Sequence, residues 1–131
     1  VLDTNILLDI LVFEDPRTIE LKQALLSGRL AAWTRKEILE EFQEVIARPL
    51  FKLDPPTQEN LIRKAQELHH HIDSSELPPA PFKCEDQDDQ VFLDLALKLA
   101  PCLLISKDNA VLKLKSKAHS YGVFILRSYS S

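Results

Sequence analysis

Short apolar runs alternate with longer helical patterns along this chain, and that alternation limits the folds that it can adopt. Apolar runs predict four strands, at residues 1–3, 30–33, 102–106 and 121–126. Apolar residues spaced three or four positions apart predict helices between them, at residues 5–13, 16–27, 35–48, 57–72, 88–100 and 109–119. Strands that alternate with helices form a parallel sheet covered on both faces. We therefore predict an α/β fold, with three layers (α/β/α) around a parallel sheet of four to five strands.

Residues with special backbone preferences mark the boundaries of these elements. Gly28 is a helix stop, and Thr34 is a good N-cap for the helix that follows it. The long helix is predicted to end at His69–His71, in solvent. Consecutive helical residues point in different directions, so the three histidines are not expected to share a metal. The Ser- and Pro-rich stretch 73–83 is a predicted loop, with one edge strand near residues 82–84.

Length and composition favour a soluble enzyme-sized domain. The 131 residues, without repeats or a long linker, predict one domain over residues 1–131. No apolar stretch approaches the roughly 20 residues that span a bilayer. The two cysteines suit a reducing compartment, so we expect a cytoplasmic protein. The net charge of −4 argues against a protein that coats nucleic acid non-specifically, but it is compatible with a nuclease that carries metal ions.

Four acidic residues are placed where they can share one site. Asp3 closes the first apolar run, and Asp108 follows the run at 102–106. The carboxyl ends of parallel strands meet at one crevice, so we expect these two side chains to lie close together. Asp89 opens an apolar helix, and Glu41 lies beside the apolar stripe of another. Crowded carboxylates repel one another unless a multivalent cation neutralises them, which predicts a magnesium or manganese site of the kind that cuts phosphodiesters.

Helix phase selects one glutamate from three candidates. At about 100° per residue, one face of the helix carries a buried stripe, formed by Ile38, Leu39, Phe42, Val45 and Ile46. Glu41 lies about 100° from the centre of this stripe, whereas Glu40 and Glu44 lie about 160° away. Glu41 is therefore predicted to reach the crevice, and its two neighbours are predicted to face solvent.

Each of these acids also has a purely structural explanation. Acids favour helix N-termini, and Asp88 is the predicted N-cap of its helix, with Asp86 in the preceding loop in a supporting role. Asp89 then stands in the first turn, and the choice between Asp88 and Asp89 as the metal ligand stays open. The residues around Asp3 and Asp108 could likewise form only a helix cap and a turn. The coincidence of acids at two strand ends and beside two apolar stripes favours a site.

Basic residues near the predicted crevice are candidates for binding phosphate groups. Lys107 is the strongest candidate because it adjoins Asp108, and Lys113 lies on the last predicted helix. Arg35, Lys36 and Arg48 could form a second rim. A solvated helix face is the simpler explanation for any single lysine.

Four stretches of the chain match motifs of one protein family. The opening VLDTN (1–5) looks like a first strand with its metal-binding aspartate. ILEEF (38–42) is similar to an ILxEL pattern, and CEDQDD (84–89), leading into FLDLA (92–96), is similar to CRDPDDDKFLELA. LISKD (104–108) is similar to a strand end LVTGD. Together they resemble the PIN-domain ribonucleases, and in particular a prokaryotic branch described as toxin components of toxin–antitoxin pairs.

The resemblance implies a fold, an activity and a set of site residues. It implies four or five parallel strands and divalent-metal-dependent cleavage of single-stranded RNA by a toxin that an antitoxin protein inhibits. PIN-domain toxins commonly form homodimers. Four acids would bind one or two Mg²⁺ or Mn²⁺ ions: Asp3, Glu41, Asp89 and Asp108. Asn5 and Ser106 resemble the polar residues that orient these acids.

The chain departs from the branch pattern at several positions. The branch's arginine, proline and third aspartate are replaced by Glu85, Gln87 and Gln90. Its glycine is replaced by Lys107, and an acid often found two places after the last aspartate is replaced by Ala110. The four core acids are intact, which favours activity, while the ligands of a second metal ion stay open.

Other classes of protein remain as alternatives. A catalytically silent PIN-like module used for binding or assembly would explain the missing accessory acid. A structure-specific DNA nuclease is compatible with the fold, although the chain lacks the long basic arm that gripping duplex DNA requires. A receiver domain needs an acid pair after its first strand, where Thr4-Asn5 stands, and a haloacid-dehalogenase-type phosphatase needs an aspartate at the position of Asn5.

Overall fold

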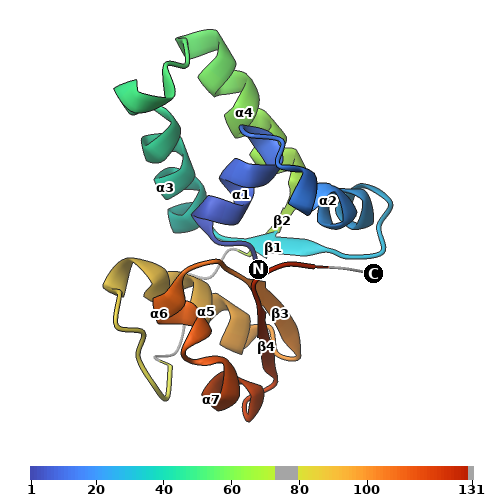
Figure 1. The fold of residues 1–131 in the computed structure, drawn as a ribbon, viewed down its shortest axis with the longest axis vertical. Helices are drawn as coiled ribbons and strands as arrows, with labels where there is room; N and C mark the ends of the chain where they lie inside the picture. The colour runs from blue at the N-terminus through green and yellow to red at the C-terminus, as the bar shows by residue number, and fades with distance from the viewer. Residues whose placement is uncertain (73–79, 130–131) are drawn as a thin grey trace.

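The computed structural model describes residues 1–72 and 80–129, and its elements fall into an upper and a lower group in Figure 1. The upper group contains α1 (Thr4–Leu11), α2 (Ile19–Leu26), α3 (Lys36–Ile46), α4 (Pro55–Leu68), β1 (Ala32–Thr34) and β2 (His69–His71). The lower group contains α5 (Gln90–Lys98), α6 (Asn109–Leu112), α7 (Lys115–His119), β3 (Cys102–Ile105) and β4 (Val123–Leu126). Three 3-10 turns complete the described elements: η1 (Pro16–Thr18), η2 (Pro49–Phe51) and η3 (Gln87–Asp89). The α/β class is therefore confirmed.

The strands form two parallel pairs. β1 pairs with β2, and β3 pairs with β4. The segment before α1 joins the second pair through a single parallel bridge between Leu2 and Ile105. The described residues contain no ladder that joins the two pairs, so one continuous sheet of four to five strands stays a prediction.

Three details of the predicted strand pattern are wrong. The first strand is reduced to the bridge at Leu2, because the chain turns into α1 directly after Asp3. Residues His69–His71 do not end a helix: the backbone of His69 is extended, and the three residues pair with β1. No strand forms at 82–84, where the side chain of Gln90 accepts the hydrogen bond from the Cys84 amide at 2.6 Å. Of the predicted loop, residues 73–79 lie outside the described residues.

Helix ends follow local chemistry, with some corrections. Asp54 accepts a hydrogen bond from the Thr57 amide at the start of α4, where two prolines suit the first turn. Gly28 has a φ of +81° just beyond α2, as a helix stop requires. Thr34 is the last residue of β1 rather than an N-cap, and Arg35 takes the cap position without a side-chain hydrogen bond. The predicted helices at 16–27 and 109–119 are each split into two shorter elements.

Buried side chains hold the two groups together. One cluster packs α1 against α3 and α4, through Leu7, Leu8, Phe42, Ile46, Leu61 and Ala65. A second packs α5 against β3 and β4, and includes Phe92, Leu93, Leu95, Leu104 and Ile125. A third cluster lies between them and contains Leu2, Ile6 and Ile105, so it fixes the start of α1 against the end of β3. The junction at which the acids were predicted to meet is therefore anchored by core packing.

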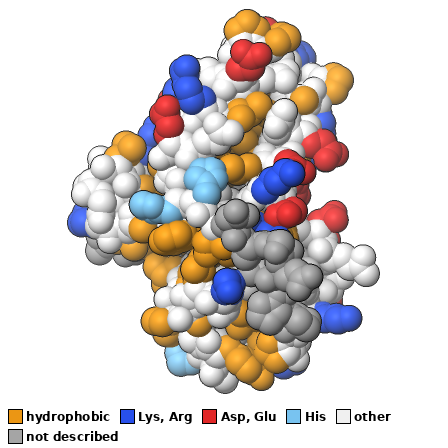
Figure 2. Space-filling view, turned by 180° about the vertical axis from the view of Figure 1, so that it is seen from behind, with side chains coloured by type: hydrophobic (Ala, Val, Ile, Leu, Met, Phe, Trp, Pro, Cys, Tyr) orange, Lys and Arg blue, Asp and Glu red, His pale blue; other side chains and the backbone are white. Residues whose placement is uncertain are grey.

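Surface features follow from this arrangement. Acidic side chains gather along the edge that α3 occupies, at the right in Figure 2. Cys84 and Cys102 are both free. Among the described residues, no helix has the length and apolar character needed to cross a membrane.

Candidate metal centre

A pocket of about 250 Å³ opens where the bridge at Leu2 and the end of β3 meet the starts of α1 and α5. Acidic residues dominate its lining, which comprises Asp3, Thr4, Asn5, Glu41, Val45, Arg48, Asp86, Asp88, Asp89, Phe92 and Asp108. The four predicted metal-binding acids are thus brought together, along with Asn5, Asp86 and Asp88. We call this the acid pocket.

Asp3 is held in the acid pocket by two hydrogen bonds. Its Oδ1 accepts from the Ile6 amide at 3.0 Å and so caps α1, which makes Asp3 rather than Thr4 or Asn5 the cap of that helix. Its Oδ2 accepts from the hydroxyl of Ser106. Leu2 and Ile105 are partners in a parallel bridge, so the residues that follow them, Asp3 and Ser106, are neighbours. Ser106, which the resemblance implies as an orienting residue, thus contacts Asp3.

Ser106 also orients the second strand-end acid. Its Oγ accepts a hydrogen bond from the Asp108 amide at 3.1 Å, and the side chain of Ser106 is completely buried. Asp108 in turn caps α6, because its Oδ1 accepts from the Ala110 amide at 2.8 Å. One buried hydroxyl therefore links Asp3 and Asp108.

Glu41 reaches the acid pocket from α3, as its helix phase predicts. Thr4 donates a hydrogen bond from its hydroxyl to Glu41 Oε2 at 3.0 Å. Glu41 is half-buried, whereas Glu40 and Glu44 are exposed, and Glu40 pairs with Lys36. The role of Thr4 was not predicted, because no local pattern indicates which side chain of α1 will face α3.

Asp89 has the least satisfied carboxylate of the group. Its Oδ2 is buried and has no hydrogen-bond partner among the described residues. Asp86, Asp89 and Asp108 each have a carboxylate oxygen within 4.8 Å of those of the other two. Asp86, not Asp88, is the residue that caps η3, through a 2.9 Å hydrogen bond from the Asp88 amide, so the predicted capping role of Asp88 is wrong.

The glutamine that follows Asp89 fixes the position of this acidic segment. Besides accepting from Cys84, the side chain of Gln90 donates from Nε2 to Asp94 Oδ1 at 2.9 Å. The amide therefore ties the loop before η3 to the first turns of α5. One of the departures from the branch pattern has a structural role here.

The electrostatics of the acid pocket oppose full ionisation. Burial, followed by the neighbouring Asp108 carboxyl, raises the pKa of Asp89 to about 7. Burial raises the pKa of Asp3, although hydrogen bonds from Ser106 and the Ile6 amide oppose the change. Burial also raises the pKa of Glu41, with the hydrogen bond from Thr4 opposing it and the charge of Asp88 adding to it.

The residues of the acid pocket fit a hard divalent cation. Oxygen ligands are what Mg²⁺ and Mn²⁺ prefer, and all the titratable ligands here are carboxylates. The buried, unpartnered Oδ2 of Asp89 leaves an acceptor directed at no protein donor in the described part of the chain. A bound cation would satisfy that oxygen and offset both the burial and the mutual repulsion that raise these pKa values.

Three of the predicted phosphate-binding residues, Lys107, Lys113 and Arg35, do not line this pocket. The ammonium of Lys107 pairs with Asp9, and Lys113 pairs with Glu85 at 3.3 Å. The guanidinium of Arg35 pairs with Glu37 at 2.7 Å. Arg48, which belongs to the predicted second rim, is the basic residue among those that line the acid pocket.

Carboxylates at adjacent strand ends of an α/β fold are compatible with a metal-binding phosphodiester hydrolase. Comparison with known families narrows this class. The model of the PIN domain family matches residues 1–110, and the chain therefore belongs to that family. PIN domains are generally metal-dependent nucleases, and many are toxins of toxin–antitoxin pairs. No curated protein and no solved structure matches the chain.

Proposed function

We propose that this PIN domain is a divalent-metal-dependent endoribonuclease that cleaves single-stranded RNA. The observation that carries the proposal is the buried carboxylate oxygen of Asp89, which lies beside Asp86 and Asp108 and has no hydrogen-bond partner among the described residues. Asp3, Glu41, Asp89 and Asp108 are the proposed ligands of Mg²⁺ or Mn²⁺. Asp86 is a further candidate ligand, because its carboxylate lies in the tightest group of three.

The residues around these acids would keep the ligands in place. Ser106 holds Asp3 and the backbone of Asp108, and Thr4 holds Glu41. Asp89 would release a proton when a cation binds, because its carboxyl has a pKa of about 7. When bound, the cation would act as a Lewis acid on the scissile phosphate. Arg48 would bind a phosphate oxygen at the rim.

The shape and charge of the molecule favour an unpaired strand as substrate. The acid pocket, at about 250 Å³, offers room for a phosphate and its nearest groups. The net charge is −4, so the surface supplies few of the phosphate contacts on which binding to duplex DNA depends. A flexible single strand can bring one phosphate into the pocket without such a surface.

A side-by-side digestion tests the substrate class. Labelled single-stranded RNA, single-stranded DNA and a DNA flap are incubated with Mn²⁺, with Mg²⁺ or with EDTA. We expect cleavage of the RNA alone, its loss in EDTA and its loss in Asp108→Asn. Preference for the flap would indicate a structure-specific DNA nuclease. No cleavage of any substrate would favour a silent binding module.

Glu41 and Glu40 supply a matched pair of variants. Both lie on α3, and their substitution by glutamine removes the same charge, but only Glu41 lines the acid pocket. Glu41→Gln should abolish cleavage, and Glu40→Gln should leave it nearly intact. The reverse order would contradict the assignment of Glu41.

The biological setting that we infer is that of a cytoplasmic toxin. An antitoxin protein would inhibit the enzyme, and the enzyme would act as a homodimer. Several large apolar side chains are exposed and could support association: Phe13, Ile19, Leu26 and Leu50 are each more than half exposed. Light scattering at micromolar concentration tests the dimer, and co-expression with a candidate antitoxin tests the inhibition.

A further inference from the structure

An ion pair beside the acid pocket has no part in the function proposed above. Asp9, on α1, pairs with the ammonium of Lys107, on the loop after β3. The side chain of Asp9 is 10% exposed and that of Lys107 is 34% exposed, so the carboxylate is mostly buried and the lysine is partly exposed. Both residues line a second pocket, of about 390 Å³, and neither lines the acid pocket. We call this second one the paired pocket.

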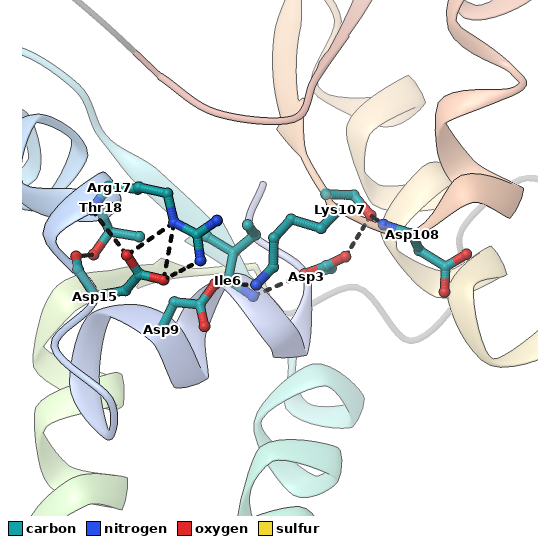
Figure 3. A network of polar contacts seen from close by, with 9 residues as sticks. Asp3, Ile6, Asp9, Asp15, Arg17, Thr18, Lys107 and Asp108 are labelled. Carbon is teal, nitrogen blue, oxygen red and sulfur yellow. Dashed lines mark hydrogen bonds and ion pairs between the residues drawn. The ribbon is translucent and has the colours of Figure 1, made fainter.

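The direction of the Lys107 side chain matters because its neighbour in the sequence, Asp108, lines the acid pocket. Lys107 stands between Ser106, which donates to Asp3, and Asp108, which lines the acid pocket. Figure 3 shows its side chain extending from beside Asp108 toward Asp9 on α1. The backbone of Lys107 therefore lies at the edge of the acid pocket, whereas its ammonium is bound outside that pocket.

A lysine in this position can neutralise either of two acidic groups. Its four-carbon stem is flexible, and its charge is compact. If Asp9 lost its charge, the ammonium would lose its ion-pair partner and could adopt another direction. The carboxylates of the acid pocket begin at the next residue, Asp108, and crowded carboxylates repel one another and attract any cation.

We propose that Asp9 is a positioning residue that holds Lys107 out of the acid pocket and so keeps the pocket open to a divalent cation. An ammonium in that pocket would compete with the metal without supplying a Lewis acid. The proposal rests on the metal site of the proposed function and not on the identity of its substrate.

The size of the effect follows from simple competition. If Lys107 occupied the acid pocket for about nine-tenths of the time once Asp9 was neutralised, the apparent Kd for Mn²⁺ would rise about tenfold. Removing the charge of Lys107 as well would remove the competitor. A loss that a second substitution reverses cannot come from damage to α1.

The test measures Mn²⁺ binding by electron paramagnetic resonance for four proteins: wild type, Asp9→Asn, Lys107→Met and the double variant. Glu59→Gln, an exposed change on α4, removes the same charge as Asp9→Asn at a distance from the site. Thermal melting confirms that each variant is folded. We expect Asp9→Asn to raise the Kd about tenfold, and the double variant and Glu59→Gln to remain within about twofold of wild type.

Two results would overturn the proposal. Unchanged Mn²⁺ affinity in Asp9→Asn would show that Lys107 does not compete, and equally weak binding in the double variant would show that Asp9 acts independently of Lys107. Failure of the proposed metal site is recognised separately, because wild type would then bind no Mn²⁺, and both proposals would fall.

Discussion

The acid pocket and the paired pocket both border α1, but their carboxylates differ in whether they have protein partners. In the paired pocket, Asp9 has Lys107 as a partner, and Asp15 is held by Arg17 at 2.7 Å. In the acid pocket, Asp89 keeps a buried oxygen without a partner in the described chain. Asp9 and Asp15 are thus neutralised by protein cations, whereas Asp89 retains an oxygen that a bound cation can satisfy.

The largest effect should come from the unsatisfied acid. Asp89→Asn removes a proposed ligand and relieves repulsion within the cluster, so RNA cleavage should fall by about 10²–10³-fold, as for the loss of one group that stabilises a transition state. The Tm in EDTA should rise, and the gain in Tm with Mn²⁺ should disappear. Cleavage assays and thermal melts check both parts. A variant as active as wild type would place the metal elsewhere.

Ser106 should have the next largest effect. Ser106→Ala removes the hydrogen bond to Asp3 and the acceptor for the Asp108 amide, without changing the charge. Groups that orient metal ligands typically contribute 10–100-fold to metal affinity, and we expect a loss of that order in Mn²⁺ titrations. Ser27→Ala, at the C-cap of α2 and outside the acid pocket, is the control and should bind Mn²⁺ as wild type does. Equal affinities would mean that Ser106 only fills space.

The pH dependence separates the two pockets further. The pKa of Asp89 is raised to about 7, so the carboxyl must lose a proton when a cation binds, and Mn²⁺ affinity should rise about tenfold from pH 6 to pH 8. Without metal, the raised pKa means that the folded state gains stability from Asp89 protonation at low pH. That contribution is lost as the pH rises toward 7.

The measurement is the difference in stability between wild type and Asp89→Asn. Burial lowers the pKa of His69, which makes the fold less stable as the pH falls below about 6.5, but both proteins share this contribution. In EDTA, the stability of wild type should show a fall as the pH rises toward 7 that Asp89→Asn lacks. Identical slopes would assign the proton to another group.

The smallest effect should come from the exposed ion pair of the paired pocket. The side chain of Arg17 is 79% exposed, and its contacts with Asp15 lie in η1. Exposed pairs contribute little, because water and salt screen them. Arg17→Gln should leave Mn²⁺ affinity and cleavage unchanged within about twofold. A large loss of cleavage with unchanged metal affinity would instead indicate that RNA crosses this pocket.

Periodicity and strand ends predicted much of the site. The apolar side chains of α3 mark the face that meets the core, so the angular position of Glu41 around the helix could be calculated from its neighbours alone. Asp3 and Asp108 were predicted to approach each other because both follow parallel strands, and the bridge between Leu2 and Ile105 produces that approach. These features depend on regular geometry, which a sequence pattern contains.

Pairings between distant segments could not be predicted in the same way. Asp9 and Lys107 are far apart in the sequence, and neither has a pattern that indicates its partner. His69–His71 form a strand only because β1 offers hydrogen bonds, so tertiary pairing overrides a helical pattern that extends through them. The cap at Asp86 rather than Asp88 reflects a shift of two residues at a helix boundary, which local preferences do not resolve.

Three consecutive side chains in the loop after β3 make contacts in three different places. Ser106 binds Asp3, Lys107 binds Asp9, and Asp108 caps α6 while lining the acid pocket. Inserting or deleting a single residue here would disrupt all three sets of contacts at once. Over evolutionary time this loop should therefore accept changes of side chain far more readily than changes of length, and a homologue with a longer loop should have lost its Lys107 equivalent as a partner of α1.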